Sequence, residues 1–260
     1  MKRHLLLCLW AAVAAGCVTE QGGEFEPTRP GYYLYDHAAA PLLGAMNDVW
    51  PVFAFIRYWE AETDEERERI HDLFFYTQRI VCEGNLCRII CDRWELAIDT
   101  GGRPLSEAGA CWTFRYAGRD DSDPGDAPRL CAPESGDSRY VLHWPAAAAG
   151  DGFGGEFRVA ATLETTVSAP GVTTHCLYLH AEGRGSVRAP DIDIDFETTQ
   201  PLVYRPLERA FGSGALRLTT TADGKSETAE ASILSPAEVR IDYNGYHKIW
   251  PRYGSYFCYE

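Results

Sequence analysis

The chain has 260 residues, a formal net charge of −14, and a hydrophobic fraction of 45%. This acidic balance disfavours nucleic acid and anionic lipid surfaces as partners, because like charges repel. The hydrophobic fraction is large enough to build a core and indicates a soluble folded body. Its length fits one large domain or two small ones.

The first residues predict export. Lys2 and Arg3 precede an unbroken apolar run from Leu5 to Ala15. This pattern is typical of a secretory signal peptide, here residues 1–16, and the run is too short to span a bilayer. No later segment is judged apolar enough to cross a membrane.

The end of the leader, Ala14, Ala15, Gly16 and Cys17, resembles the lipobox of bacterial lipoproteins. The resemblance implies that Cys17 is acylated and becomes the first residue of the mature chain. It also implies sorting to the outer membrane, because Val18 and not aspartate follows the cysteine. Ala14 replaces the usual leucine, so ordinary cleavage and a freely secreted or periplasmic protein remain the alternative. A lipid would anchor the protein to the membrane without spanning it.

Residues 17–30 are polar, contain glycine and proline, and have no hydrophobic periodicity, which predicts a flexible tether. Residues 31–260 are expected to form a single domain, helical over about 36–78 and β over about 79–260. Pro41 and Pro51 divide the first helical pattern into two pieces, with Asn47 or Asp48 as a cap for the second.

The segment "TDEERERIHDLFFYTQ" is the clearest helix signal. Thr63 and Glu66 have the spacing of a capping box, and acidic residues occupy the positive end of the helix dipole. Ile70, Leu73, Phe74 and Thr77 would share one face.

From about Arg79 the hydrophobic period changes to two, which predicts strands separated by tight turns. A turn at Asp223-Gly224 would place Arg217 opposite Glu230, and a turn at Asn244-Gly245 would pair Tyr243 with Tyr246. Hairpins joined in sequence form an antiparallel meander. The expected class is therefore α+β, with short N-terminal helices before the meander; a β-sandwich or a partly closed barrel is the alternative topology.

Cys82, Cys87 and Cys91 crowd the segment "IVCEGNLCRIICD". A two-residue turn at Gly84-Asn85 would bring Cys82 opposite Cys87, where a disulfide could form. The shared face is apolar, which disfavours zinc. Because Cys8 leaves with the leader and Cys17 is acylated, an odd number of the nine cysteines remains, and at least one thiol lacks a partner in the chain.

Catalytic motifs are not evident: the chain contains no GxSxG elbow, HExxH, P-loop or well-placed GxGxxG, and no cofactor or metal is expected. The segment "DIDIDFE" would align Asp191, Asp193, Asp195 and Glu197 on one strand face. These carboxylates are too widely spaced along one strand to wrap a calcium ion, so the preferred interpretation is a solvated face. An envelope hydrolase or metal-dependent enzyme that uses Asp191, Asp193 or Asp195 with a histidine is the alternative.

Aromatic residues crowd the C-terminal end, where they could bind a glycan or a protein: Tyr243, Tyr246, Trp250, Tyr253 and Tyr256. Packing in the core and between strands is the alternative role for them. Taken together, the sequence predicts a lipid-anchored envelope lipoprotein of the outer membrane or cell surface with a non-enzymatic binding or structural role. Its expected partners are the membrane, through the lipid, and a protein or glycan, but not nucleic acid.

Overall fold

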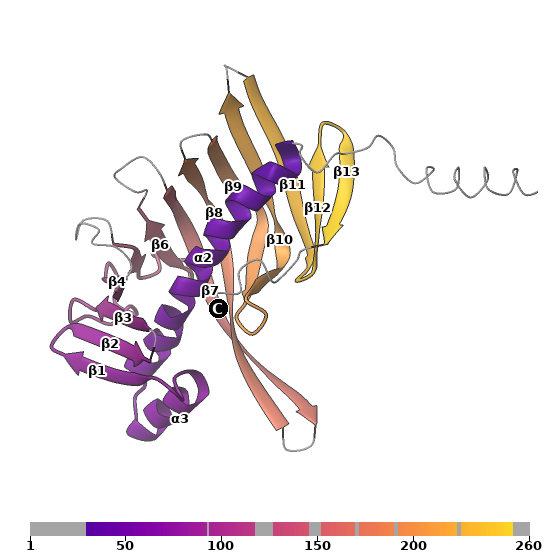
Figure 1. The fold of residues 1–260 in the computed structure, drawn as a ribbon. Helices are drawn as coiled ribbons and strands as arrows, with labels where there is room; N and C mark the ends of the chain where they lie inside the picture. The colour runs from indigo at the N-terminus through magenta and orange to yellow at the C-terminus, as the bar shows by residue number, and fades with distance from the viewer. Residues whose placement is uncertain are drawn as a thin grey trace, which may run out of the picture.

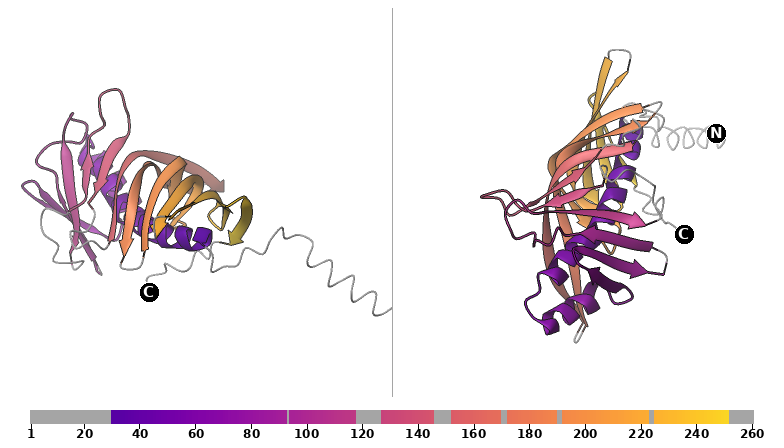
Figure 2. Two further views of the ribbon diagram at one scale, coloured as in Figure 1. Left: turned by 90° about the horizontal axis from the view of Figure 1, so that it is seen from above. Right: turned by 90° about the vertical axis from the view of Figure 1, so that its left-hand side faces the viewer.

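The computed structural model describes residues 30–251, except 93, 118–126, 146–151, 170–171, 190–191 and 223–224. Two helices and thirteen antiparallel strands form an α+β fold in which each strand pairs with its neighbours in sequence. The predicted class is confirmed in this broad sense. The described strands form one sheet, not two, and the sheet curves around α2 without closing, since β1 and β13 lie at its two edges (Figures 1 and 2).

The elements have the following bounds: α2 (Pro30–Trp59), α3 (Asp64–Phe74), β1 (Arg79–Glu83), β2 (Leu86–Cys91), β3 (Trp94–Asp99), β4 (Cys111–Ala117), β5 (Arg129–Cys131), β6 (Tyr140–Trp144), β7 (Gly152–Ala169), β8 (Val172–Ala189), β9 (Ile192–Arg205), β10 (Ala210–Ala222), β11 (Lys225–Ser235), β12 (Glu238–Tyr243) and β13 (Tyr246–Pro251).

Helix α2 is one continuous helix, so the prediction of two pieces divided by prolines is wrong. It begins at Pro30, earlier than the expected position 36, and includes Pro41 and Pro51. One stripe of its buried residues recurs every three or four positions along the concave face of the sheet: Leu34, Ala38, Leu42, Met46, Val49, Phe53 and Ile56. An interior proline costs about 3 kcal/mol, whereas each large buried side chain contributes about 1.5–3 kcal/mol. Burial along the whole helix therefore outweighs the two prolines.

Residues Leu34–Trp59 of α2 are also long and apolar enough, by length and composition, to cross a membrane. This differs from the expectation that no segment after the leader would qualify. In the structure, 61% of the most apolar window is buried. A helix that is covered on most sides does not need a polar face. A core helix can therefore have the same mean hydropathy as a membrane-spanning helix.

Helix α3 packs against the end of α2. Ile70 is buried, and the half-buried Phe74 meets the Trp50 ring edge-on with centroids 6.0 Å apart. Leu73, expected on the same face, is 38% exposed, while the neighbouring Phe75 is only 2% exposed. The reason is that the helix ends at Phe74, and the Phe75 N–H then donates to the His71 carbonyl as the chain turns.

The predicted cap of α3 has a clear geometry: the Thr63 hydroxyl accepts a hydrogen bond of 3.1 Å from the Glu66 N–H. Thr63→Ala should therefore lower the free energy of unfolding by about 0.5–2 kcal/mol. Chemical denaturation measures the change. Thr77→Ala, an exposed threonine beyond the helix, is the control; equal shifts for both variants would show that the cap does not stabilise the fold.

Two-residue turns set the register of the hairpins that the sequence marks most clearly. Asn244 and Gly245 have φ angles of 50° and 80°, as a type I′ turn requires, and Tyr243 lies opposite Tyr246. Gly84, with φ of 62°, opens the turn that places Cys82 opposite Cys87. Arg217 lies opposite Glu230. Each of these turns determines which residues lie opposite each other along its strand pair.

Three phenylalanine rings stack on the concave side of β7, β8 and β9. Phe153, Phe157 and Phe196 are nearly parallel, with centroids 5.8–6.2 Å apart. Glycines make this possible, because a Cβ on Gly185 would lie 2.6 Å from Phe196 Cζ and a Cβ on Gly155 would lie 2.8 Å from Phe157 Cε2. A close-packed aromatic layer therefore lies directly under the part of the sheet whose opposite, convex face is described next.

Candidate functional site

A row of polar, mostly charged residues crosses the convex face of the sheet. Its members are consecutive cross-strand partners from β5 to β13: Arg129, His143, Glu156, Arg184, Glu197, Arg217, Glu230, Asp242 and His247. We call this set the charged row. Its charge alternates in sign from Glu156 to Glu230, and the repeat equals the spacing between strands, about 4.8 Å.

Ion pairs link neighbours within the charged row. The Arg217 guanidinium donates to the carboxylates of Glu197 at 2.6 Å and Glu230 at 3.3 Å, which raises the pKa of Arg217. His143 Nδ1 lies 3.3 Å from a Glu156 carboxylate oxygen. Exposed pairs of this kind contribute only about 0–1 kcal/mol each. The row therefore matters more for what the convex face can recognise than for stability.

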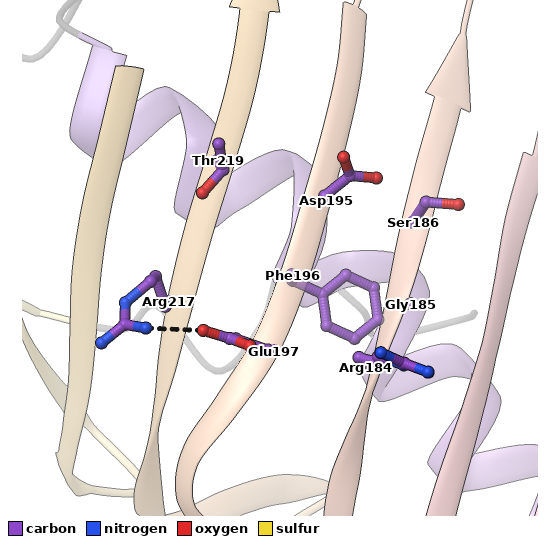
Figure 3. Close-up of a pocket in the computed structure, with 8 residues that line it drawn as sticks. All are labelled: Arg184, Gly185, Ser186, Asp195, Phe196, Glu197, Arg217 and Thr219. Carbon is purple, nitrogen blue, oxygen red and sulfur yellow. Dashed lines mark hydrogen bonds and ion pairs between the residues drawn. The ribbon is translucent and has the colours of Figure 1, made fainter. Parts of the chain in front are cut away.

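The charged row widens into an open hollow of about 510 Å³ around Arg184. Its lining residues come from β8, β9 and β10: Arg184, Gly185, Ser186, Asp195, Phe196, Glu197, Arg217 and Thr219 (Figure 3). Small side chains at Gly185, Ser186 and Thr219 leave this space between the longer charged ones. Among the ion pairs of the described residues, none includes Arg184, so its guanidinium can accept an external partner.

The hollow offers donors and acceptors side by side. The guanidinium of Arg184 can donate several hydrogen bonds in a planar fork, and the Ser186 and Thr219 hydroxyls can donate or accept. The Asp195 and Glu197 carboxylates accept only. This combination suits a ligand surface that carries both charges and hydrogen-bonding groups, as polypeptides do.

The predicted acidic strand forms part of this site. Asp193, Asp195 and Glu197 are exposed, while Ile194 and Phe196 are buried, so the expected alternation holds over the described part of β9. Asp191 lies outside the described residues. The carboxylates are not merely solvated.

Arginines from the neighbouring strands partner these carboxylates. Arg188 lies 2.6 Å from an Asp195 oxygen and 3.6 Å from an Asp193 oxygen. In the described part of the chain, no group of three or more His, Cys, Asp or Glu residues could hold a metal ion. The ion pairs that the structure describes for Asp193 and Asp195 are with Arg188 and not with a histidine.

A second charged cluster lies beside the row, at the start of β6. The Asp137 carboxylate accepts hydrogen bonds from Arg139 and Arg158, and these bonds lower the pKa of Asp137 far below its usual range. Arg139 also pairs with Glu182, and Arg158 with Glu134. The sequence does not reveal this cluster, because Asp137 and Arg158 are distant in sequence and only the fold brings them together.

The aromatic residues of the C-terminal end are only partly described. Tyr243 is half-buried and packs against the core. Tyr246 lies opposite Tyr243, and Trp250 lies opposite Val239, in the β12–β13 hairpin. Tyr253 and Tyr256 lie outside the described residues, as does Cys17. An aromatic binding patch therefore stays a prediction.

Two disulfides join neighbouring strands in the first half of the sheet. Cys82 and Cys87 are joined across the β1–β2 hairpin, with Cα atoms 4.0 Å apart. Cys111 and Cys131 are joined across β4 and β5, and sequence reasoning missed this pair. The only sequence signal for it is the cysteine count, because the sequence between the two strands has no short turn motif that would set their register. Among the cysteines that the structure describes, Cys91 and Cys176 are free thiols.

These pairings predict the outcome of a thiol titration. In denatured but unreduced protein that lacks residues 1–23, three thiols should react, those of Cys91, Cys176 and Cys258, while the four disulfide cysteines do not; reduction should then expose four further thiols. Cys111→Ser combined with Cys131→Ser should leave the unreduced reading unchanged. A higher unreduced reading for the natural chain, or stoichiometric zinc by elemental analysis, would contradict the assignment.

No family model, curated protein or solved structure matches the chain. The role of the convex face must therefore be inferred from its own residues. The charged row, the hollow and the free Arg184 guanidinium are the features that bear on it.

Proposed function

We propose that the chain is a lipid-anchored envelope lipoprotein whose folded body binds a protein partner on its convex face. The anchor is inferred from the leader and from the lipobox-like residues Ala14 to Cys17. The chain from Cys17 to the first helical residue, Pro30, could reach about 40 Å when extended. Such a tether keeps the body close to the membrane surface while leaving it free to turn.

The charged row around Arg184 is the observation that carries the binding role. Complementary charges at an interface mainly set specificity and the rate of association, and arginine is enriched among residues that dominate binding energy. An alternating pattern favours a partner that presents both signs at matching spacing. A protein surface can do so, whereas a uniformly anionic polymer would be repelled by the acidic chain.

The test is capture from envelope extract by the soluble body, residues 24–260, and by two charge-reversal variants. Arg184→Glu should abolish capture of the specific partner. Arg79→Glu is the matched control, because Arg79 is also exposed on a strand but lies on β1, away from the charged row. Both variants change the net charge equally, so a nonspecific charge effect would weaken them equally.

The outcomes separate the candidate roles. Loss with Arg184→Glu and retention with Arg79→Glu support the proposal. Equal capture by all three proteins would contradict binding at the convex face. Release of the captured material by soluble glycan would instead favour a glycan partner and the C-terminal aromatic residues Tyr243, Tyr246 and Trp250.

A further inference from the structure

The strands β7 and β8 extend beyond the rest of the sheet as a two-stranded arm (Figure 1). Pairing of β6 with β7 ends at Val159, and pairing of β9 with β8 starts at Leu179. Residues 160–169 and 172–178 therefore pair only with each other within the described chain. We call these two segments the β7–β8 arm. It projects about 25 Å, given about 3.3 Å per residue.

The arm differs in composition from the convex face. Threonine dominates it, at positions 162, 165, 166, 173 and 174. Glu164 and His175 are its only acidic or basic side chains, and the Thr165 hydroxyl lies 3.0 Å from His175 Nδ1. Val167 is 68% exposed, and Leu163 is 37% exposed on the same face. The two segments of the arm lack lysine, arginine and proline, the residues that usually protect exposed strand edges.

The two edges of the arm are not equivalent at its base. On β8, the Leu177 carbonyl accepts a hydrogen bond of 2.8 Å from the indole N–H of Trp50 in α2, and Leu177 is fully buried. This contact fixes the direction in which the arm leaves the body. In the part of the chain that the structure describes, no hydrogen bond joins α2 to the β7 edge of the arm, so we take β7 as the edge available for pairing.

We propose that the β7 edge of the arm pairs with the same edge of a second copy of this chain. An isolated two-stranded ribbon is only marginally stable in water, and its unpaired edge is a template for another strand. Two identical β7 edges related by a twofold axis run antiparallel and match in sequence. The exposed Val167 and Leu163 would then be covered by their symmetry equivalents.

Charge also favours contact through the arms and not through the bodies. With a net charge of −14, two bodies repel each other at short range. The arm is almost neutral, and its length of about 25 Å exceeds the Debye length of about 8 Å at physiological salt. Arm pairing thus keeps the bodies beyond the range of their mutual repulsion.

The contact would be weak in solution. Strand addition over about eight residues buries less than the roughly 1,200 Å² that stable interfaces usually need. Confinement of both copies to one membrane raises their effective concentration and would make the contact productive. That last step rests on the proposed lipid anchor, whereas pairing in concentrated solution does not.

Variants of the full-length chain that carry one added cysteine, compared in the native membrane with the unsubstituted chain, test the proposal. Thr162→Cys and Thr166→Cys place a thiol along the β7 edge, and one of them should form disulfide-linked homodimers under mild oxidation; position 164 is avoided because it lies opposite the free thiol of Cys176. Thr228→Cys, on an exposed position of β11, is the matched control and should stay monomeric. Adding Val167→Lys should remove the cross-link, whereas Leu207→Lys, in an exposed turn of the body, should not.

Sedimentation of the soluble body separates this proposal from the anchor. Self-association should change little as salt rises above the physiological concentration, because the paired arms hold the acidic bodies farther apart than the Debye length. Self-association that weakens with salt, cross-links as rapid at Thr228→Cys as on the arm, or cross-links from the arm to a different protein would each overturn arm-to-arm pairing. Self-association in solution without cross-links in the membrane would support arm-to-arm pairing but contradict the lipid anchor.

Discussion

Trp112→Ala should lower the free energy of unfolding by about 3–5 kcal/mol, the range found when a large aromatic side chain is removed from a core. Trp112 is fully buried on β4. Its ring lies 5.7 Å from Phe55 and 6.2 Å from Trp59, measured between centroids, so it joins the sheet to the end of α2. Its indole N–H donates to the Arg103 carbonyl at 2.8 Å, and that carbonyl would lose this partner.

Denaturant titration with two controls measures the effect. Trp112→Phe keeps an aromatic ring but loses the indole donor, so it should cost less than the alanine variant. Leu207→Ala removes a side chain that is 74% exposed and should change stability little. A shift for Trp112→Ala no larger than that for Leu207→Ala would show that α2 and β4 do not share a core.

Gly183→Ala is the second substitution with a large expected effect. The added Cβ would lie 2.1 Å from the Glu156 carbonyl oxygen and 2.7 Å from the Phe157 Cα. These are backbone atoms of the adjacent strand, so neither can rotate away, and the β7–β8 pair must separate locally. Overpacking of this kind costs about 1–3 kcal/mol.

The same substitution of glycine by alanine in α2 should raise, not lower, the free energy of unfolding. A Cβ added at Gly44 would meet no atom within 4 Å. Gly44→Ala should therefore stabilise the fold by about 0.5–1 kcal/mol, because alanine is the better helix former. Thermal or denaturant unfolding of the two variants compares them directly. Stabilisation by Gly183→Ala would contradict the close approach of β7 and β8.

Local signals allowed prediction of the hairpins but not of the long helix. Asn244-Gly245 and Gly84 determine register through backbone conformations that involve only two residues. The continuity of α2 through Pro41 and Pro51 depends on burial by strands up to about 190 residues away in sequence, as the packing of α2 against β12 illustrates. The residue pattern of α2 alone does not show that burial by the sheet outweighs the cost of two interior prolines.

The charged row illustrates a similar limit. The sequence indicated an exposed acidic face on β9 and placed Arg217 opposite Glu230, which are two parts of the row. Joining Glu156, Arg184 and Glu197 requires the registers of β7–β8 and β8–β9, and the second contains a bulge between Ala181 and Arg184. A bulge changes which residues face each other, and neither hairpin has a turn that defines its register as clearly as Asn-Gly does.

We propose that a lipid on Cys17 anchors the protein, while α2 is a core helix of the body. Fractionation of full-length Cys17→Ser after an alkaline carbonate wash tests both parts together. The account predicts that the natural chain stays with the membrane, because two or more acyl chains hold it stably, and that Cys17→Ser is recovered as a soluble folded protein or as unprocessed precursor retaining its leader. Processed Cys17→Ser that remains in the washed membrane would contradict the account, since Leu34–Trp59 would then be the segment that holds the chain there.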